Sequence, residues 1–482
     1  MDKLKLSKSK HPDKVILQIA DIARQNGFEI YLVGGFVRDR LMGKECNDID
    51  ISVIGDAVKF AGLTAKEFKT NLNAVYKKFG TALLVLNDVK IEFASAREES
   101  YKTDSRKPEV KFSDLEHDLS RRDFTVNALA VSLNENNSGE IIDMVGGMSD
   151  LNNKLLKTPL DPLKTFDDDP LRMMRAARFA SQLDFKIEQN TFEAIGGMKE
   201  RLRISQDKQG VVSQERITDE FLKILQSQKP SAGLKSLQKS GLMEIIFPEV
   251  YALEGVDQRK DFHHKDVFYH TLQVIDNISK NTENVWLRFA ALMHDIAKPP
   301  TKKFVEGTGW TFHGHEELGA RWQKKIFTRM KLPFDKLEYV EKLIRLHLRP
   351  IALAEENVTD SAIRRLIFEA GDDIEDLMTL CRADITSKDP DKVKKYLGNF
   401  ARVEKRIAQV EERDRIRNFQ SPVRGEEIMK ICNIPPSREV GIIKSKIEEA
   451  ILDGLIPNEY EAALEYLYKI KDEVLAGTQA RG

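Results

Sequence analysis

Two carboxylates near the N-terminus stand at a spacing that suits a divalent cation. Asp48 and Asp50 are separated by one residue within the segment 48–55, whose alternation of apolar and polar residues predicts a half-buried strand. Side chains two residues apart in a strand lie on the same face, so the two carboxylates repel each other. A cation such as Mg²⁺ relieves that repulsion and keeps positions open for phosphate oxygens. Such a site could activate a hydroxyl nucleophile and neutralise a departing pyrophosphate.

A glycine pair precedes these carboxylates. Gly34 and Gly35 follow an apolar segment and precede a helical segment that carries Arg38. Glycine permits close backbone approach, so a triphosphate can bind the amide groups at the start of a helix. Arg38 could then bind a phosphate oxygen by two hydrogen bonds. A glycine pair alone usually marks a turn, but strand, turn, helix and strand follow one another within residues 32–52, which favours a nucleotide site.

A helix predicted after residue 169 carries groups that could select a nucleobase. Asp169 stands at the cap position, and Asp169 and Arg172 share a helix face. Cytosine and adenine both offer an amine beside an unprotonated ring nitrogen, so a carboxylate and an arginine complement either base and oppose uracil and guanine. Arg175 and Arg178 continue the row at steps of three residues. A helix cap and a solvated arginine face are the alternatives.

Histidine is concentrated in one part of the chain. Seven of the nine histidines fall between residues 263 and 347, and clustered histidines often line a metal site. Imidazole and carboxylate together suit manganese, iron, nickel, zinc or magnesium, so the ligand types leave the metal open. Water bound to such a metal becomes a nucleophile near neutral pH.

The elements that must position these groups divide the chain into a mixed N-terminal part and a helical remainder. Helices are predicted at 56–68 and 122–133, and strands at 29–35, 48–55, 81–86, 89–96 and 140–147, with a hairpin turn at Asn87-Asp88. After about residue 165 helical periodicity dominates. We therefore expect an α+β fold, divided into a head at 15–155, an all-α neck at 156–252, an all-α histidine-rich domain at 255–410 and a small helical module at 415–482.

Composition limits the setting of the protein. No apolar run approaches the roughly 18–20 residues that span a bilayer, and the N-terminus lacks the apolar stretch of a signal peptide, so we expect a cytoplasmic protein without a membrane partner. With 76 basic and 77 acidic residues the net charge is −1, and an RNA-binding surface must therefore be a local patch. The charged segment 392–419 is one candidate, and a solvated linker helix is its alternative. Three widely separated cysteines argue against a disulfide framework or a zinc ribbon.

The ordered motifs of the first half resemble a known family. The segment 32–52, "LVGGFVRDRLMGKECNDIDIS", resembles the signature of class II tRNA nucleotidyltransferases and bacterial poly(A) polymerases, within the DNA polymerase β superfamily. Further segments resemble that family's ribose-binding motif (121–130), hinge (143–151), base-selecting motif (168–179) and supporting helix (213–225). The first acid of the base-selecting motif is commonly Glu in the family and is Asp168 here.

The resemblance implies a polymerase-β-like head that adds CCA to the 3′ end of tRNA from CTP and ATP. It makes Asp48 and Asp50 the catalytic pair and the Mg²⁺ ligands. Glu92 is a candidate third carboxylate, although a strand Glu paired with Arg97 is the simpler interpretation. The nucleotide-binding residues that it implies are Gly34, Gly35, Arg38, Arg122, Asp123, Asn127, Asp169, Arg172, Arg175 and Arg178. Poly(A) polymerase and an enzyme that adds only CC or only A are alternatives of the same chemistry.

The histidine-rich part resembles the HD phosphohydrolase superfamily, through segments 263–271, 291–299, 312–320, 345–350 and 381–387. The resemblance makes His270, His294, Asp295 and Asp384 ligands of a divalent metal of open identity. His315 and His347 match positions that complete a second metal site or bind phosphate, and His263, His264 and His313 receive no role. A helical scaffold with vestigial ligands is one alternative, and an HD phosphohydrolase whose head only binds RNA is another. The oligomeric state is left open.

Overall fold

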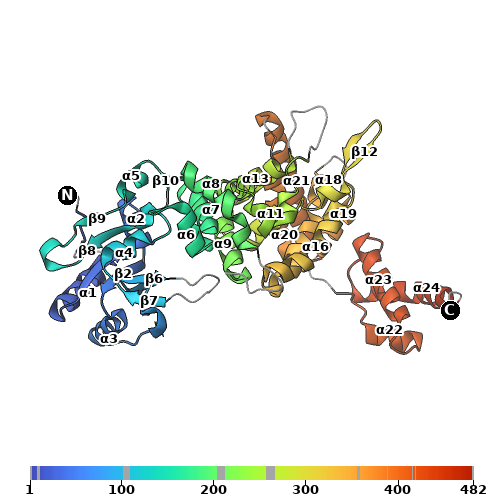
Figure 1. The fold of residues 1–482 in the computed structure, drawn as a ribbon. Helices are drawn as coiled ribbons and strands as arrows, with labels where there is room; N and C mark the ends of the chain where they lie inside the picture. Colours follow the sequence, from blue (N-terminus) through green and yellow to red (C-terminus); the bar gives the residue numbers. More distant parts are fainter. Residues whose placement is uncertain are drawn as a thin grey trace. The chain divides into compact units, whose positions relative to one another are not determined.

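Two compact units, residues 1–248 and 249–482, make up the chain. The computed structural model describes residues 3–7, 11–100, 109–203, 212–256, 266–354, 359–387, 389–414, 416–417 and 420–479. Figure 1 labels the elements.

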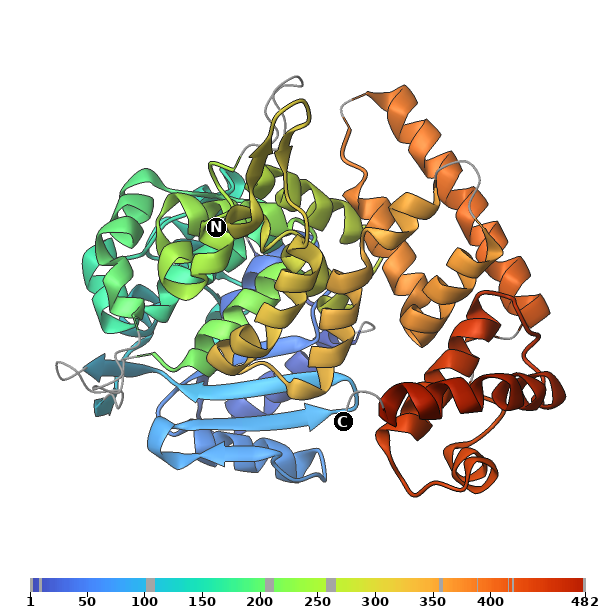
Figure 2. The same ribbon diagram turned by 90° about the vertical axis from the view of Figure 1, so that its right-hand side faces the viewer.

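A seven-stranded sheet forms the head of the first unit (Figures 1 and 2). Its strand order is β3 (Ala74–Tyr76), β4 (Thr81–Leu86), β5 (Val89–Ser95), β2 (Asp48–Ile54), β1 (Glu29–Val33), β8 (Leu129–Ser132) and β9 (Ile141–Asp143). Neighbouring strands are antiparallel, except that β2 and β5 run parallel. Leu86 pairs with Val89, which confirms the predicted hairpin at Asn87-Asp88. A separate pair consists of β6 (Arg97–Ser100) and β7 (Glu109–Phe112).

Helix α3 (Ala57–Glu67) determines which face of the sheet carries the carboxylates. Its buried Phe60 meets Phe93 of β5 edge to face, with ring centroids 5.6 Å apart. Because alternate strand residues point to opposite faces, Glu92 turns away from α3. Asp50 lies beside Glu92 in the β2–β5 register and faces the same way. Two further helices of the head are α1 (Asp13–Gln25) and α2 (Gly34–Leu41).

The prediction of a helix at 122–133 is wrong. This segment forms a 3₁₀ turn, Thr125–Asn127, followed by β8, which pairs with both β1 and β9. All four residues of β8 are buried. A strand covered on both faces lacks the polar alternation that marks a half-buried strand, so the pattern resembles that of a buried helix.

The neck of the first unit is helical, as predicted. After α4 (Leu115–Ser120) and α5 (Gly147–Asn152) it contains α6 (Pro162–Asp168), α7 (Leu171–Leu183), α8 (Gln189–Met198), α9 (Gln214–Gln226), α10 (Pro230–Lys239) and α11 (Leu242–Ile246). The short helix α12 (Pro248–Tyr251) spans the boundary between the two units. Helix α7 packs against α9 and α10. Gly233 permits the close approach of α10, since a Cβ there would lie 2.6 Å from the Ala177 carbonyl oxygen, and its N–H donates to Ser181 Oγ at 2.7 Å. A short parallel bridge joins β10 (Leu155–Leu156) to β11 (Lys186–Ile187).

The second unit is largely helical over its described residues. Its first nine helices are α13 (Val267–Ile278), α14 (Val285–Met293), α15 (Lys298–Thr301), α16 (His315–Met330), α17 (Leu337–Leu346), α18 (Arg349–Leu353), α19 (Asp360–Ala370), α20 (Ile374–Asp384) and α21 (Pro390–Asp414). Phe289 of α14 and Phe327 of α16 are fully buried and pack edge to face at 5.8 Å. A hairpin of β12 (Lys303–Val305) and β13 (Gly309–Thr311) was not predicted, because strands of three residues are too short to show alternation.

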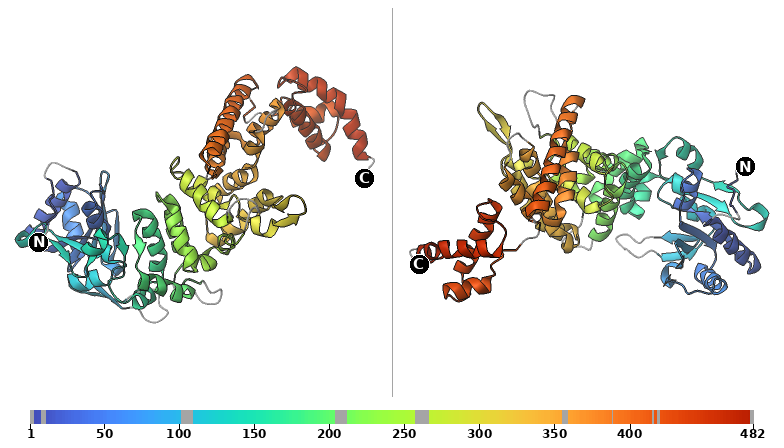
Figure 3. Two further views of the ribbon diagram at one scale, coloured as in Figure 1. Left: turned by 90° about the horizontal axis from the view of Figure 1, so that it is seen from above. Right: turned by 180° about the vertical axis from the view of Figure 1, so that it is seen from behind.

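Three further helices follow residue 420: α22 (Gly425–Cys432), α23 (Arg438–Leu452) and α24 (Tyr460–Gln479) (Figure 3). Arg365 of α19 pairs with Asp453, just after α23, at 2.8 Å. The sheet of the head and the helices of the remainder confirm the α+β fold class. Among the described residues, every helix is too short or too polar to span a bilayer.

Candidate active sites

Three carboxylates gather on one face of the central sheet. Asp50 lies opposite Val33 and beside Glu92, and Asp48 shares the face of Asp50 because it stands two residues away. Burial raises the pKa of Asp50 to about 6. The charges of Glu92 and Asp48 also raise this pKa, whereas the charge of Arg122 lowers it. A divalent cation would stabilise the three neighbouring carboxylates. Glu92 is one of them because it lies directly beside Asp50 in the sheet. The side chain of Arg97, the alternative partner of Glu92, lies outside the described part.

Gly34 is the point at which the glycine turn approaches these carboxylates. Its φ is +73°, and a Cβ there would lie 2.9 Å from Asp50 Oδ2 and 3.0 Å from Arg122 Nη1. A side chain would therefore be strained in the backbone and would displace both groups. Helix α2 begins at this residue, so its first amide groups lie beside Asp50, where a phosphate next to a bound cation would be stabilised. Gly35 follows within the same turn.

Arg122 is positioned beside Asp50 by a residue that was not predicted. Asp118 is buried, and it accepts hydrogen bonds from Arg121 at 3.0 Å and from Arg122 at 3.1 Å. Burial alone would raise the pKa of Asp118, but the two guanidinium groups lower it below its usual range. The four-residue spacing of Asp118 and Arg122 was the available sequence signal.

A chain of buried hydrogen bonds joins the glycine turn to the neck. Arg38 donates to Asp39 from Nε at 2.8 Å and to Asn127 Oδ1 from Nη1 at 2.6 Å. Asn127 donates to Asp123 at 2.9 Å, and Asp123 accepts from Arg175 Nε of α7 at 2.7 Å. Burial alone would raise the pKa of Asp123, but Arg175 and Asn127 lower it far below its usual range. This chain fixes α2, the 3₁₀ turn and α7 to one another, and the nucleotide contacts expected of its members stay predictions.

Asp169 and Arg172 have separate partners within the protein. Asp169 Oδ1 accepts the Leu171 N–H at 3.1 Å, and its Oδ2 lies 3.2 Å from Arg216 Nη2 of α9. The N-cap of α7 is Pro170 rather than the predicted Asp169, because the helix begins one residue later than expected. Arg172 Nη1 donates to the Thr165 carbonyl at 3.3 Å. Arg216 was not predicted individually, and it orients the carboxylate on which base selection would depend.

Arg178 connects α7 to α9. Its Nε lies 2.8 Å from Glu220 Oε2, and its guanidinium lies 4.3 Å from the centre of the Phe179 ring. Burial and the charge of Arg175 lower the pKa of Arg178 to about 10. With 12% of its side chain exposed, Arg178 supports the helix from within, and its contact with a nucleotide stays a prediction.

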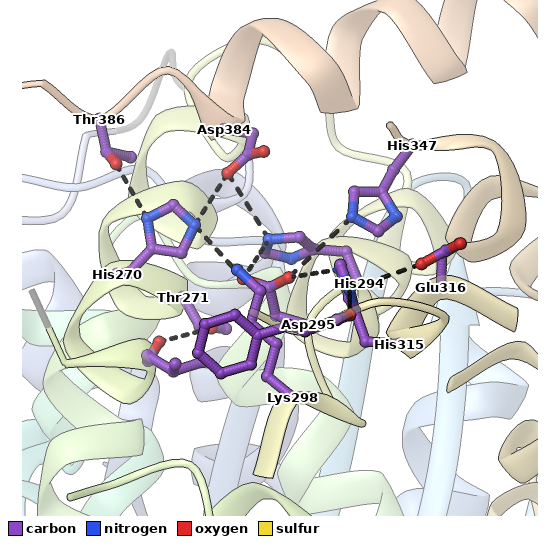
Figure 4. Close-up of polar contacts among 12 residues, drawn as sticks. His270, Thr271, His294, Asp295, Lys298, His315, Glu316, His347, Asp384 and Thr386 are labelled. Atoms are coloured by element: carbon purple, nitrogen blue, oxygen red, sulfur yellow. Dashed lines mark hydrogen bonds and ion pairs between the residues drawn. The ribbon is translucent and has the colours of Figure 1, made fainter. Parts of the chain in front are cut away.

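Four buried histidines of the second unit direct one ring nitrogen toward a common centre (Figure 4). The Nδ1 atoms of His294, His315 and His347 lie 2.7 Å from the backbone carbonyl three residues earlier. His270 Nδ1 lies 2.9 Å from Thr386 Oγ1. Because a carbonyl only accepts, the first three Nδ1 atoms carry hydrogen, and each of these rings, when neutral, presents an Nε2 lone pair inward. Outer hydrogen bonds of this kind orient metal-binding histidines.

Asp295 and Asp384 complete the cluster. His270 Nε2 lies 2.8 Å from Asp384 Oδ1, and His294 Nε2 lies 3.2 Å from Asp295 Oδ2. His315 Nε2 lies 3.3 Å from the other oxygen of Asp295. The ligand atoms form two groups, each within 4.8 Å, namely His270, His294 and Asp384, and Asp295, His315 and His347. We refer to these six residues as the HD cluster, and Asp295 directs one oxygen toward each group.

The chemistry of the HD cluster fits bound cations. The Nε2 atoms of His294, His315 and His347 are buried at 3.2, 3.3 and 4.0 Å from oxygens of Asp295, but none of them forms a hydrogen bond of normal geometry. Such atoms cost about 1–3 kcal/mol each unless another group satisfies them. Burial would lower the pKa of His294, but Asp295 and Asp384 outweigh it and raise that pKa to about 10. Burial and the charge of His294 lower the pKa of His347 to about 3. Asp295 and Asp384 therefore favour positive charge beside His294, whereas the His347 ring stays neutral and keeps an Nε2 lone pair for a cation.

Lys298 belongs to this site and was not predicted. Its Nζ lies 2.7 Å from Asp295 Oδ2 and 5.5 Å from the centre of the Phe312 ring. The spacing of three residues from Asp295 was the only signal. Of the histidines without a predicted role, His313 is exposed, and His263 and His264 lie outside the described residues.

Comparison with known proteins matches three families along the chain. The family described as "Poly A polymerase head domain" matches residues 30–157. That described as "Probable RNA and SrmB- binding site of polymerase A" matches residues 184–253, and "HD domain" matches residues 267–389.

Curated relatives and solved structures agree with these matches. The A-adding tRNA nucleotidyltransferase of Deinococcus radiodurans is 31% identical over 72% of this chain and 78% of its own length. The multifunctional CCA protein of Mannheimia succiniciproducens is 32% identical over 74% of this chain and 83% of its own. The Bacillus stearothermophilus CCA-adding enzyme in complex with CTP has a TM-score of 0.63 at 22% identity, over 98% of this chain and 99% of that one, which shows a shared fold. The chain therefore belongs to the tRNA nucleotidyltransferase and poly(A) polymerase family, as a member that carries an HD domain.

Proposed function

We propose that this protein adds CCA to the 3′ end of tRNA from CTP and ATP, without a nucleic-acid template. This proposal rests mainly on the position of Asp50. This carboxylate lies against Gly34 at the start of α2 and near the Arg122 guanidinium. Nucleotidyl transfer requires a carboxylate for the cation, backbone amides for the triphosphate and a guanidinium for the negative charge of the phosphates. These three kinds of group lie together at this position. The named relatives support tRNA as the acceptor.

In this proposal Asp48 and Asp50 are the ligands of Mg²⁺, and Glu92 adds negative charge beside them. Bound Mg²⁺ supplies activation of the 3′-hydroxyl and neutralisation of the departing pyrophosphate. The first amide groups of α2, at Gly34 and Gly35, bind the triphosphate together with Arg122.

Base selection is assigned to α7. Asp169 accepts the exocyclic amine of cytosine or adenine, and Arg172 donates to the unprotonated ring nitrogen. Uracil or guanine would leave buried polar groups unpaired, at a cost of about 1–3 kcal/mol each. Arg216 orients Asp169, and the chain of hydrogen bonds through Arg175 fixes α7 against the head.

We further propose that the HD cluster is a phosphohydrolase site. His270, His294 and Asp384 hold one divalent cation, and Asp295, His315 and His347 hold a second. Cations at these positions activate water and neutralise phosphate charge. A phosphomonoester or a 2′,3′-cyclic phosphate at a damaged RNA end is the proposed substrate, and the identity of the metal is open.

The proposed organisation assigns nucleotide addition to the head at 15–155, base and RNA binding to the neck at 156–252, hydrolysis to 255–410 and an accessory role to 415–482. Helix α21 begins with several lysines and is a candidate for contact with tRNA phosphates. Action on tRNA supports a cytoplasmic location.

Incorporation of labelled CTP and ATP tests the first proposal. The intact protein is incubated with Mg²⁺ and a tRNA transcript that lacks its last three nucleotides, beside an oligo(A) primer. Two C and one A on the tRNA, followed by arrest, is the expected result. A long A tract on either RNA would instead identify a poly(A) polymerase, and no incorporation would contradict nucleotide addition by the head.

Addition of the terminal A alone is the second candidate. The likeness to the A-adding enzyme of Deinococcus radiodurans favours it. A transcript that already ends in CC separates the two. An A-adding enzyme extends it by one A and ignores the shorter transcript, whereas a CCA-adding enzyme extends both.

A further inference from the structure

We propose that the β12–β13 hairpin is a docking surface for the 3′-terminal nucleotide of a single-stranded RNA, whose terminal phosphate then reaches the HD cluster. The inference rests on the phosphohydrolase activity proposed above and names its substrate class. The hairpin occupies the chain between Lys298 and His315, both of which lie at the cluster. It projects from the neighbouring helices as a separate arm (Figure 1), and both of its ends connect to residues at the site.

The hairpin presents large apolar side chains to solvent. Phe304 and Trp310 lie opposite each other in the strand register, with ring centroids 5.3 Å apart. Phe304 is 52% exposed, Val305 43% and Trp310 37%. Exposed apolar residues grouped on one element mark an interaction surface. Nucleobases stack on aromatic rings of this kind with little dependence on sequence.

Positive charge accompanies these rings. The segment 298–314 contains Lys298, Lys302 and Lys303, and its single acidic residue is Glu306 at the hairpin turn. Lys302 Nζ lies 4.5 Å from the centre of the Trp310 ring. An ammonium group beside an aromatic ring can meet a base and a neighbouring phosphate together. This combination favours an RNA end over a purely apolar partner.

The hairpin lies at a suitable separation from the cluster. Trp310 precedes Phe312 by two residues, about 7 Å along an extended strand. The Phe312 carbonyl accepts the His315 Nδ1 hydrogen at 2.7 Å, and the Phe312 ring lies beside Lys298. This separation therefore allows a nucleotide stacked on Trp310 to place its terminal phosphate within reach of Lys298 and of cations held by the HD cluster.

Tryptophan fluorescence of the intact protein tests binding without turnover. The three tryptophans, Trp286, Trp310 and Trp322, belong to the second unit. The probe is CpCpA with a 3′-hydroxyl, which lacks the terminal phosphate of the proposed substrate and is added to protein freed of metal with EDTA, so that its internal phosphodiesters are not cleaved. It is expected to quench the emission of the wild type and of Val305→Ala, but not that of Trp310→Phe. Adenosine is expected to bind at least tenfold more weakly, because it lacks phosphates for the lysines. Equal quenching of the wild type and Trp310→Phe, or equal affinity for adenosine, would overturn the docking surface.

Kinetics distinguish docking from support of His315. Trp310→Ala is expected to lower kcat/KM for CpCpA ending in a 2′,3′-cyclic phosphate about tenfold, mainly through KM. Hydrolysis of glycerol 1,2-cyclic phosphate, which has no base and no other aromatic ring, should not change, and Trp310→Phe should recover most of the loss. Parallel loss on both esters would assign the ring a structural role only and overturn the proposal. Absence of hydrolysis of both esters by the wild type would contradict the phosphohydrolase, and the fluorescence result would still decide the docking surface.

Discussion

The head and the HD cluster both bring carboxylates together for cations, but they prepare them differently. Five of the six side chains of the HD cluster are buried, and each imidazole is oriented by an outer hydrogen bond. In the head Asp48 and Glu92 are exposed, and only Asp50 is substantially covered. The protein alone thus sets the geometry of one site, whereas the other leaves room for a substrate to complete it. We expect the HD cluster to retain metal and the head to receive Mg²⁺ with its nucleotide.

Replacement of the two head aspartates should have the largest effect. Asp48→Ala combined with Asp50→Ala is expected to lower nucleotide addition at least about 10³-fold, because loss of the cation removes several kcal/mol of transition-state stabilisation. Hydrolysis of bis(p-nitrophenyl) phosphate should stay unchanged, and so should the metal retained after dialysis. Asp21→Ala, on the surface of α1, is the control. Parallel loss of both activities would contradict two independent sites.

The converse variant is Asp295→Asn. It preserves the size of the side chain but removes the charge that faces both groups of the HD cluster. We expect hydrolysis to fall about 100-fold or more and the metal content, measured by mass spectrometry, to fall from about two ions to less than one. CTP and ATP addition should persist at the wild-type rate. Unchanged metal content would mean that the cluster does not use Asp295 as a bridge, and the contrast between the two sites would be lost.

Asp123→Asn should weaken the connection between head and neck. Asp123 is buried, whereas 34% of the Arg175 side chain is exposed, so water can partly replace the lost counter-charge. We therefore expect the first unit to lose about 1–2 kcal/mol of unfolding free energy at pH 7. The pKa of Asp123 is lowered by folding from about 3.9 in an unfolded chain. Its stabilisation is therefore fully present above about pH 5 and is lost as the pH falls further. The difference between wild type and variant should be constant from pH 5 to 8 and smaller near pH 3.

Hydrogen exchange during urea unfolding measures this difference in peptides that span β8. Tryptophan fluorescence does not report it, because all tryptophans lie in the second unit. Asp21→Asn, whose carboxylate is exposed on α1, is the matched control. If the wild type and Asp123→Asn differed in unfolding free energy by the same amount at pH 3 and pH 7, the packing of Asp123 rather than its charge would account for the stabilisation.

The parts of these sites that are local in sequence could be predicted, and the contacts across elements could not. The alternation in 48–55 correctly placed Asp48 and Asp50 on one face, and the order of His and Asp motifs indicated the HD cluster. Asp118, Arg216 and Lys298 were not predicted, because their importance depends on which side chain lies opposite them. The helix predicted at 122–133 was wrong for a related reason, since burial of both faces of β8 is a property of the sheet.

Arg216→Ala should have the smallest effect and the most specific one. Arg216 touches Asp169 at 3.2 Å, but about half of its side chain is exposed, so water can partly replace it. We expect addition of CTP to slow only about threefold, while the preference for CTP over UTP falls about tenfold because Asp169 is less well oriented. Arg203→Ala, an exposed arginine of the same unit that pairs with Glu200, is the control. A slower reaction with unchanged preference would place Arg216 on the RNA or the phosphates instead, and base selection would then depend on α7 alone.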